Sequence, residues 1–538
     1  MATKKLPIGV QSFEVLRKNN CLYIDKTGLI PQLLNSRVYF FSRPRRFGKS
    51  LLLSMLAAYF RGQKELFKGL YIEHAEEELA QEENREAWQS YPVLYLDFNT
   101  ENYVDSAAIE NILNTHLTEW EAEYGRNEVE QTYSSRFKGV IERAYKKEQK
   151  PVVILIDEYD KPLYESLENL ELNATYRGVL RGFYSVIKSQ DAYIRFAFLT
   201  GITKFNKVSV FSGLNNLKDI SMRKEFSALC GITEQELHEN FQPYIVSLAE
   251  ELDTSEEDVF ARLKKEYDGY LFAAGGENVY NPFSVLNALD AKVLDRYWFA
   301  TGTPTFLVNY LKKAHYFIPN LGHQVRLSAA RFDNYNADSL DPIPILYYTG
   351  YLTINGYNPE TDVYSLGIPN NEVRYGFFEN LLGSYAPSYL TLGFSVKDFL
   401  DAVRTGDVDT FMTNLKSLLA SIPYDTASAS EVELRERDYQ IAVYLVFALM
   451  GLFTQTEVQS ATGRADCVAI TPQYVYVFEF KLWSTGTAEE ALQQIVDKGY
   501  ATKYASAGKE LILVGASFDE AKRNIGEWVE RRNSIVGS

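Results

Sequence analysis

The first half of the chain alternates short apolar runs with longer stretches in which apolar and polar residues are mixed. Four apolar runs have the length and composition of buried strands: Val38–Phe41, Val93–Phe98, Val152–Ile156 and Ile194–Leu199. Between them, apolar residues recur at helical spacing, as in Ser50–Phe60 and Ala107–Tyr124. Strands that alternate with helices predict an α/β fold with a doubly wound, mostly parallel sheet over residues 1–232.

From Thr233 the pattern becomes helical, and residues 233–424 are predicted to form a mainly helical middle region. Within it, Ile345–Asn370 has the pattern of a hairpin with its loop at Asn358–Asp362. Two interpretations of residues 345–370 stay open, because a winged-helix element that brings DNA and a plain structural hairpin both fit the pattern.

The polar stretch Tyr424–Glu433 is typical of a linker, so we expect a third domain over residues 425–538. After this linker the pattern gives a long helix, three strands, a helix and a strand. That order predicts a second, smaller α/β domain.

Composition and charge narrow the class of protein. The chain has 538 residues, of which 46% are hydrophobic and 14% aromatic, so it can form several large cores. The formal net charge of -16 means that the chain does not coat nucleic acid passively. Contact with nucleic acid therefore requires a local basic patch or an acidic site filled by metal. We expect the acidic segment Glu76–Glu86 to be a solvated helix.

Cysteine usage and hydropathy predict a cytoplasmic protein with no membrane partner. The three cysteines, Cys21, Cys230 and Cys467, are far apart and lack zinc or redox spacing, which fits a reducing compartment. The N-terminus lacks the apolar core of a signal peptide, and the longest apolar stretch is too short to cross a bilayer.

The first strand is followed by a sequence that ends like a phosphate-binding loop. Backbone N–H groups at a helix N-terminus bind phosphate, while the lysine and hydroxyl of such a loop serve the phosphates and Mg²⁺. The usual first glycine, five residues before Gly48, is Arg43 here. We expect Arg43, Arg45 and Arg46 to add positive charge where the phosphates would lie, with a surface or DNA-facing patch as the alternative. The predicted nucleotide contacts are Arg46, Phe47, Gly48, Lys49, Ser50 and Leu51.

Two later strand ends add acidic and hydroxyl groups to this predicted site. The strand in Pro151–Pro162 ends in Asp157 and Glu158. Asp157 is predicted to join Ser50 in holding Mg²⁺, and Glu158 to polarise the attacking water as catalytic base. Thr200, at the end of the next strand, is predicted to sense the γ-phosphate, although an ordinary turn threonine fits the sequence equally well.

A second set of candidate residues lies near the C-terminus. Asp466 belongs to one predicted strand, and Glu479 and Lys481 to the next. Residues two apart on a strand share a face, so Glu479 and Lys481 should point the same way. Hydrolysis of a phosphodiester requires carboxylates that hold metal and a group that orients water. Asp466 and Glu479 are the predicted ligands and Lys481 the orienting cation, while a salt bridge on an ordinary sheet is the alternative.

The motifs together resemble the AAA-ATPase-like family of bacterial proteins, whose members usually carry a PD-(D/E)XK nuclease-like domain at the C-terminus. The resemblance covers almost the whole chain and is carried by "YIDKTGLI", "RPRRFGKSLLLSML", "LIDEYDKP", "LTGITKF", "FSGLNNLKDIS", "YDGY" and "VYNPFSVLNAL". It implies a P-loop NTPase domain and a restriction-endonuclease-like domain. It also implies that Glu436 is a further metal ligand and that Gln494 and Tyr500 contact the nucleic acid.

The predicted function is an ATP-binding P-loop ATPase that gates or powers a metal-dependent nuclease. ATP and Mg²⁺ or Mn²⁺ are the predicted cofactors, and nucleic acid is the predicted partner, with DNA favoured over RNA. The alternative is a nucleotide-switched module that binds nucleic acid or protein through an inactive nuclease fold. A homo-oligomer is compatible with this class.

Overall fold

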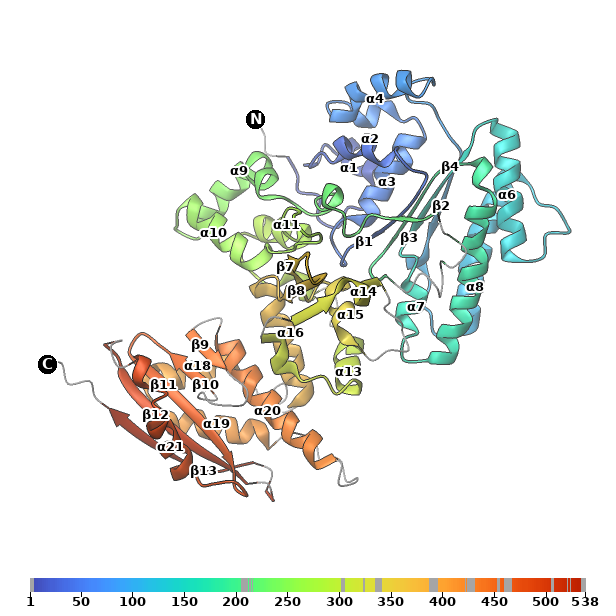
Figure 1. Cartoon of the computed structure of the whole chain (residues 1–538). Helices are drawn as coiled ribbons and strands as arrows, with labels where there is room; N and C mark the ends of the chain where they lie inside the picture. The colour runs from blue at the N-terminus through green and yellow to red at the C-terminus, as the bar shows by residue number, and fades with distance from the viewer. Residues whose placement is uncertain are drawn as a thin grey trace. The chain divides into compact units, whose positions relative to one another are not determined.

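The chain separates into two compact units, which are described one at a time (Figure 1). The N-terminal unit comprises residues 1–302 and 325–372, and the C-terminal unit comprises residues 303–324 and 373–538. The predicted middle region is thus divided between them. The computed structural model describes residues 4–204, 211, 214, 216–300, 305–322, 325–333, 341–386, 395–420, 422, 431–451, 455–458, 467–504, 508–519, 521–522 and 524–533.

A parallel five-stranded sheet forms the centre of the N-terminal unit. Its strand order is β2-β3-β4-β1-β5, and every neighbouring pair is parallel. The central strands are buried on both faces, which explains why their sequences are continuous apolar runs. The predicted α/β fold is confirmed, with strands β1 Val38–Ser42, β2 Val93–Asp97, β3 Val152–Asp157, β4 Ile194–Gly201 and β5 Lys218–Asp219.

Helices cover this sheet, and Figure 1 shows α3 on one side of it and α6 and α8 on the other. Some of these helices start at a capping side chain, such as Asp105, which accepts hydrogen bonds from the backbone N–H groups of Ala107 and Ala108 in the first turn of α5. The helices of this part are α1 Phe13–Lys18, α2 Ile30–Leu33, α3 Lys49–Phe60, α4 Tyr71–Glu82, α5 Ser106–Tyr124, α6 Tyr133–Glu148, α7 Lys161–Glu165 and α8 Leu170–Ser189.

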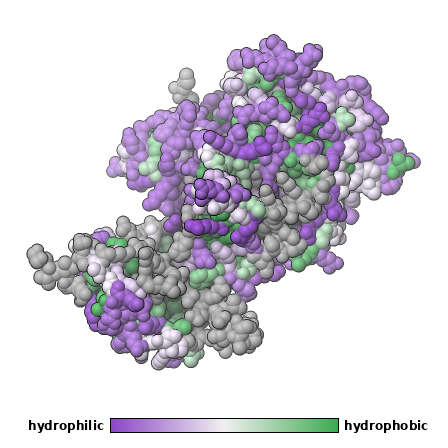
Figure 2. All heavy atoms as spheres, in the orientation of Figure 1, coloured by the Kyte–Doolittle hydropathy of each residue, from purple (hydrophilic) through white to green (hydrophobic). Residues whose placement is uncertain are grey.

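The acidic helix α4 is less solvated than its sequence predicts. Figure 2 shows hydrophilic residues over this helix. Glu76, however, is buried and accepts hydrogen bonds from the Tyr59 hydroxyl at 2.6 Å and from the guanidinium of Arg85. The expectation of a fully solvated helix was therefore wrong at Glu76, because paired polar groups can be buried inside a fold.

A group of helices packs on the N-terminal segment in the same unit. The helices are α9 Glu234–Glu251, α10 Glu256–Tyr267, α11 Pro282–Ala291 and α12 Tyr297–Ala300. Their shared core includes Leu237, Phe241 and Val285, and Leu6 of the N-terminal segment is buried in it. This packing places α9 and α11 beside the loop that precedes α3.

The hairpin predicted within residues 345–370 is present, although its first residues are helical. The small antiparallel sheet has the order β6-β8-β7, formed by Val325–Ser328, Val363–Gly367 and Thr353–Asn358, and α14 Ala329–Asp333 and α15 Pro342–Tyr348 accompany it. Every residue of α15 is buried, and the hairpin tip carries Glu360 and Asp362. A DNA-reading helix must be exposed and a phosphate-binding tip should be basic, so the structural-hairpin interpretation is favoured.

The C-terminal unit contains a mixed five-stranded sheet with the order β13-β12-β11-β10-β9. Only β11 and β12 pair in parallel, and the chain passes through α21 between them. The predicted order of elements is present, with β13 as an additional strand. The elements are α13 Thr305–Lys313, α16 Asn371–Tyr385, α18 Val396–Thr405, α19 Val408–Leu419, α20 Glu431–Met450, β9 Gln455–Val458, β10 Cys467–Ile470, β11 Tyr474–Leu482, α21 Ala488–Asp497, β12 Glu510–Asp519 and β13 Asn524–Asn533.

The two faces of this second sheet have separate cores. Phe478 of β11 packs on Phe411 and Phe447, which belong to α19 and α20. On the opposite face, Val475 and Val477 of β11 pack with residues of α21 and β12. Among the described residues, no helix of either unit is both long and apolar enough to cross a membrane.

Candidate nucleotide site and nuclease-like site

The loop between β1 and α3 has the backbone of an anion-binding helix start. Gly48 has a φ of 95°, in the left-handed region that favours glycine, and it immediately precedes the helix. The first N–H groups of a helix have no partner within the helix, so those at Lys49, Ser50 and Leu51 are suited to phosphate oxygens. Gly48 and these three residues line a polar cavity of about 540 Å³.

Lys49 is almost fully buried and is held by both its own loop and an acidic residue. Its Nζ donates to the carbonyl oxygens of Arg43 and Pro44 at 3.1 and 3.3 Å. The same Nζ lies 3.3 Å from Oε1 of Glu158. The structure thus brings together the first residue of α3 and the residue that follows β3, which are far apart in the sequence. A phosphate could replace these carbonyl oxygens as the partner of the ammonium group.

Glu158 reaches this position because of an unusual backbone conformation. Its φ is 51°, a left-handed value that non-glycine residues seldom adopt and that often marks a functional site. The residue follows β3 directly and lines the polar cavity. The placement fits the predicted catalytic base, since the carboxylate lies at the cavity where a terminal phosphate and its attacking water would meet.

Asp157 is the deeper of the two acidic residues at the end of β3. It is 1% exposed, and its Oδ1 accepts a hydrogen bond from the Thr200 hydroxyl at 2.6 Å. Burial and the charge of Glu158 raise its pKa, while hydrogen bonds from Ser50 and Thr200 oppose the rise. Ser50 lines the polar cavity, whereas Asp157 is not among its lining residues. The Ser50 hydroxyl and this carboxylate are hard oxygen donors of the kind that Mg²⁺ prefers, so the chemistry of the pair suits the predicted metal ligands.

The predicted contact between Thr200 and the γ-phosphate needs a correction. Thr200 is fully buried and does not line the polar cavity. Its hydroxyl is used by Asp157, with a second, longer bond to the carbonyl oxygen of Ile156 at 3.4 Å. The residue therefore supports a candidate metal ligand instead of facing the nucleotide.

Asp160 belongs to this site and was missed in the sequence. Its carboxylate accepts hydrogen bonds from the backbone N–H groups of Ile202 and Thr203 and from the Thr203 hydroxyl. Burial, followed by the charge of Glu158, raises the pKa of Asp160 to about 6. Gly201 permits this approach, because a Cβ there would lie 2.4 Å from Oδ1 of Asp160. The available signal was the third acidic residue of the run "DEYD".

Arg43 does not add charge to the phosphate site, which corrects the expectation from the sequence. Its side chain is 2% exposed and points into the protein. The guanidinium donates to four backbone carbonyl oxygens, those of Ser42, Ser221, Phe226 and Ser227. Its Cζ also lies 4.3 Å from the ring centroid of Phe41 and 4.2 Å from that of Phe272. Burial lowers its pKa to about 10. Arg43 is an internal anchor of the loop.

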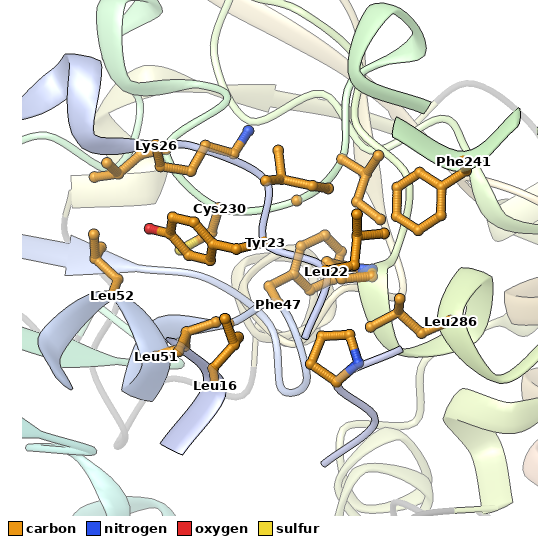
Figure 3. A pocket seen from close by; sticks show the side chains of 17 residues that line it. Leu16, Leu22, Tyr23, Lys26, Phe47, Leu51, Leu52, Cys230, Phe241 and Leu286 are labelled. Atoms are coloured by element: carbon orange, nitrogen blue, oxygen red, sulfur yellow. The ribbon is translucent and has the colours of Figure 1, made fainter. Parts of the chain in front are cut away.

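A second, apolar cavity of about 120 Å³ adjoins the polar one (Figure 3). Gly48, Leu51 and Leu286 line both cavities. Figure 3 shows Tyr23 and Phe47 among the side chains turned toward this space. Sequence reasoning missed this pocket because its walls come from the N-terminal segment, the phosphate loop and the α9–α11 group, which only the fold brings together.

Phe47 is a predicted nucleotide contact, but only its backbone is placed to make one. The ring is 1% exposed and packs edge-on against Tyr270 and Phe272, at centroid distances of 4.8 and 5.4 Å. It lines the apolar cavity and not the polar one. Phe47 therefore fixes the loop between the two cavities, while its side chain is unavailable to phosphate.

In the C-terminal unit, Glu479 and Lys481 lie on the α21 face of β11. Glu479 is 5% exposed, and its Oε1 accepts a hydrogen bond from the amide of Gln494 on α21. Lys481 is half-buried. Its side chain and that of Glu490 both lie close to Gly486. Gln494 was expected to contact the phosphate backbone, and this expectation is corrected: its amide is directed to the carboxylate. Tyr500 is half-buried and packs on the core beneath α21.

The remaining predicted ligands of this site fall outside what the structure describes. Asp466 directly precedes β10 and lies outside the described residues. For Glu436 the structure describes the backbone, which belongs to α20, and not the side chain. Among described side chains, no three histidine, cysteine, aspartate or glutamate residues converge to hold a metal ion. Glu479 is thus the one predicted ligand whose setting the structure defines.

The two sites define a P-loop nucleotide-binding domain followed by a nuclease-like domain. Residues 7–211 match the sequence model of a predicted AAA-ATPase, and residues 434–528 match that of the PD-(D/E)XK nuclease superfamily. A protein of Azotobacter chroococcum mcd 1, described as an uncharacterized protein in the vnfD 5′ region, is 37% identical over 537 residues, covering 98% of this chain and 99% of that protein. The chain belongs to the AAA-ATPase-like family and carries a C-terminal PD-(D/E)XK nuclease superfamily domain.

Proposed function

We propose that this protein binds and hydrolyses ATP and that its nucleotide state controls a metal-dependent nuclease. The observation that carries the first part is the pairing of Lys49 with Glu158 at a polar cavity of about 540 Å³ beside the start of α3. This arrangement supplies a cation for phosphates, a carboxylate for water and a helix N-terminus in one place.

The two adjoining cavities suit the two chemically different ends of a nucleotide. The triphosphate would occupy the polar cavity along Lys49 and Ser50, and the base would enter the apolar cavity past Leu51 and Leu286. A ligand site of this kind buries an apolar ring system and fixes its polar end with a few directed groups.

The hydrolysis step follows from the positions of three side chains. Phosphate oxygens would replace both the loop carbonyl oxygens and the Glu158 carboxylate as partners of Lys49. This exchange would release Glu158 from the ion pair. Glu158 would then accept a proton from the water that attacks the γ-phosphorus. Ser50 and Asp157 would hold Mg²⁺, which screens the negative charge of the phosphates when bound.

The nuclease part of the proposal rests on the buried Glu479 beside Lys481. Glu479, with Asp466 and Glu436, would hold one or two divalent ions, which supply Lewis-acid chemistry at the phosphodiester. Lys481 would orient the attacking water, and Gln494 would fix the carboxylate. DNA is the proposed substrate, and three buried cysteines that form no disulfide among the described residues fit a cytoplasmic protein.

The test is a cleavage assay with single- and double-stranded DNA and RNA, with Mg²⁺ or Mn²⁺, in the presence and absence of ATP. Wild type is compared with Lys481→Ala and Lys49→Ala, and Lys498→Ala serves as a control because Lys498 is exposed at the end of α21. We expect ATP-dependent cutting that both site variants lose and the control retains. Measurable ATP binding without cutting of any substrate would instead support a nucleotide-switched binding module with an inactive nuclease fold.

A further inference from the structure

Two arginines of the phosphate loop face the polar cavity without acidic partners. Arg45 and Arg46 are exposed and line this cavity together with Lys49 and Glu158. Within the described part of the chain, neither guanidinium forms an ion pair with a carboxylate. Most surface arginines gain little from such pairs, but a cavity-lining arginine that lacks one keeps its full charge for a ligand.

Each of these arginines is instead held against an aromatic ring. Cζ of Arg45 lies 5.1 Å from the ring centroid of Tyr164, and Cζ of Arg46 lies 4.9 Å from that of Phe283. Stacking on a ring orients a guanidinium and leaves its N–H edge available for phosphate oxygens. The two side chains are therefore directed without being neutralised.

The rings place the two arginines at different parts of the cavity. Tyr164 belongs to α7, which begins directly after the acidic run that contains Asp157 and Glu158. Arg45 is therefore on the side of the cavity where the terminal phosphate and its attacking water would lie. Phe283 belongs to α11, so Arg46 is on the side of the helices that form the apolar pocket.

The backbone of the loop is also fixed at this point. The indole Nε1 of Trp298 donates to the carbonyl oxygen of Arg45 at 3.2 Å. Gly350 has a φ of 89°, and a Cβ on it would lie 2.8 Å from Cγ of Pro44. Groups that are already in position when charge develops stabilise a transition state without the cost of reorganisation.

We propose that Arg45 supplies, from the same chain, the positive charge that stabilises the terminal phosphate during ATP hydrolysis, and that Arg46 binds the phosphates from the side of α11. This inference rests on the proposed ATPase function. In the step, the water oxygen bonds to the γ-phosphorus and the bond from that phosphorus to the β–γ bridging oxygen breaks. Glu158 takes the water proton, and ADP leaves with the bridging oxygen. Arg45 hydrogen-bonds the γ-phosphate oxygens throughout.

The first test compares ATP turnover and ATP binding in single variants. In Arg45→Ala, kcat should fall by about 10³-fold, the lower end of what a catalytic arginine contributes, while the Kd for ATP should change less than tenfold. Arg45→Lys should stay strongly impaired, because a point charge lacks the planar fork. Arg46→Ala should raise the Kd by roughly tenfold, the scale of one charge-assisted hydrogen bond. Arg61→Ala, which removes an exposed arginine at the end of α3, should match wild type.

The second test separates action within one chain from action between chains. Arg45→Ala is mixed with Lys49→Ala, which retains Arg45 but should lose phosphate binding. If the arginine acts within its own chain, the mixture stays inactive, and the specific activity of wild type does not depend on protein concentration. Restored turnover in the mixture would overturn the proposal.

The remaining outcomes separate the role of Arg45 from the proposed ATPase function. An Arg45→Ala variant with wild-type kcat would overturn the role of Arg45 alone. A wild type that binds ATP without turnover would overturn this role together with the hydrolysis part of the proposed function. If Arg45→Ala weakens DNA binding while its kcat is unchanged, the two arginines form a nucleic-acid patch and the proposal is also wrong. A wild type that binds no ATP would refute the proposed function itself.

Discussion

The two candidate sites each contain a carboxylate that is largely shielded from solvent, but they hold it with different partners. In the N-terminal unit, Glu158 faces the ammonium of Lys49 at 3.3 Å. In the C-terminal unit, Glu479 accepts a hydrogen bond from the neutral amide of Gln494. An ion pair compensates charge and changes state when a ligand replaces one partner. The Gln494 amide orients the carboxylate and, as a neutral donor, does not itself cancel the negative charge.

The contrast between ionic and neutral partners also bears on the pKa values of two other buried groups, Arg43 and Glu372. Arg43 is held by carbonyl oxygens and rings, and burial lowers its pKa to about 10. Glu372 is held by the Ser284 hydroxyl and the backbone N–H of Trp298, and burial raises its pKa to about 7. Neutral partners satisfy hydrogen bonds but offset less of the cost of burying a charge than an ion of opposite sign does.

The largest expected effect comes from removing the charge on the acidic side of the ion pair. Glu158→Gln keeps the size of the side chain but cannot take a proton, so ATP turnover should fall by about 10³-fold. Binding of ATP should be equal or tighter, because Lys49 no longer has a competing carboxylate. Single-turnover hydrolysis and equilibrium titration measure the two quantities separately. Unchanged turnover in this variant would refute the role of Glu158 as catalytic base, since Glu158 would then be only a structural partner of Lys49.

The next largest effect should come from Arg43, which has only neutral partners. Arg43→Met removes the donors to four carbonyl oxygens, three of them outside the phosphate loop, and should destabilise the N-terminal unit by about 3 kcal/mol. The measurement is chemical unfolding of the full chain with and without ATP.

Arg43→Gly sharpens this test because it restores the usual first glycine of a phosphate loop. If Arg43 is an anchor, the glycine variant is at least as unstable as Arg43→Met and binds ATP no more tightly than wild type. A glycine variant with wild-type stability would show that the loop does not need the anchor.

Local patterns predicted the elements and those candidate side chains whose position depends only on their own strand or loop. The strands β1 to β4 and the positions of Lys49, Asp157 and Glu158 beside them follow from apolar runs and their polar ends. Arg43 and Thr200 were misassigned because the direction of a side chain depends on distant partners, here residues 221–227 and Asp157. The apolar pocket was invisible for the same reason, since its walls meet only after the α9–α11 group folds onto the N-terminal segment.

In the C-terminal unit, period-two alternation correctly placed Glu479 and Lys481 on one face, opposite Phe478. It could not show that Gln494 of α21 would meet Glu479. The spacing between a strand and the helix that covers it is set by the packing of the whole layer, which no local pattern encodes.

A smaller effect is expected at the neutral partner in the nuclease-like site. Gln494→Ala removes a donor that orients Glu479, so Mg²⁺ or Mn²⁺ affinity and cleavage should fall by roughly 10- to 100-fold, as for other residues that support metal ligands. Gln493→Ala is the matched control, because the neighbouring amide is exposed and bonds to Asp497 on its own helix. Equal effects of the two variants on metal titration would show that Gln494 only stabilises α21.

The smallest effect concerns Glu372. It measures directly how much folding stability is lost when a buried carboxylate with neutral partners becomes charged. Burial raises its pKa above that of the unfolded chain, so the folded protein binds more protons than the unfolded protein between about pH 4.5 and 7. Stability should therefore fall as pH rises through this window, by about 1 kcal/mol between pH 6 and 7. Glu372→Gln removes the titration, and the difference in unfolding free energy between wild type and this variant should change by that amount. Glu360→Gln, at the exposed hairpin tip, should leave the pH profile unchanged. A flat difference for Glu372→Gln would mean that the nearby charge of Arg296 compensates the carboxylate as an ion pair would, and the contrast between ionic and neutral partners would not extend to this residue.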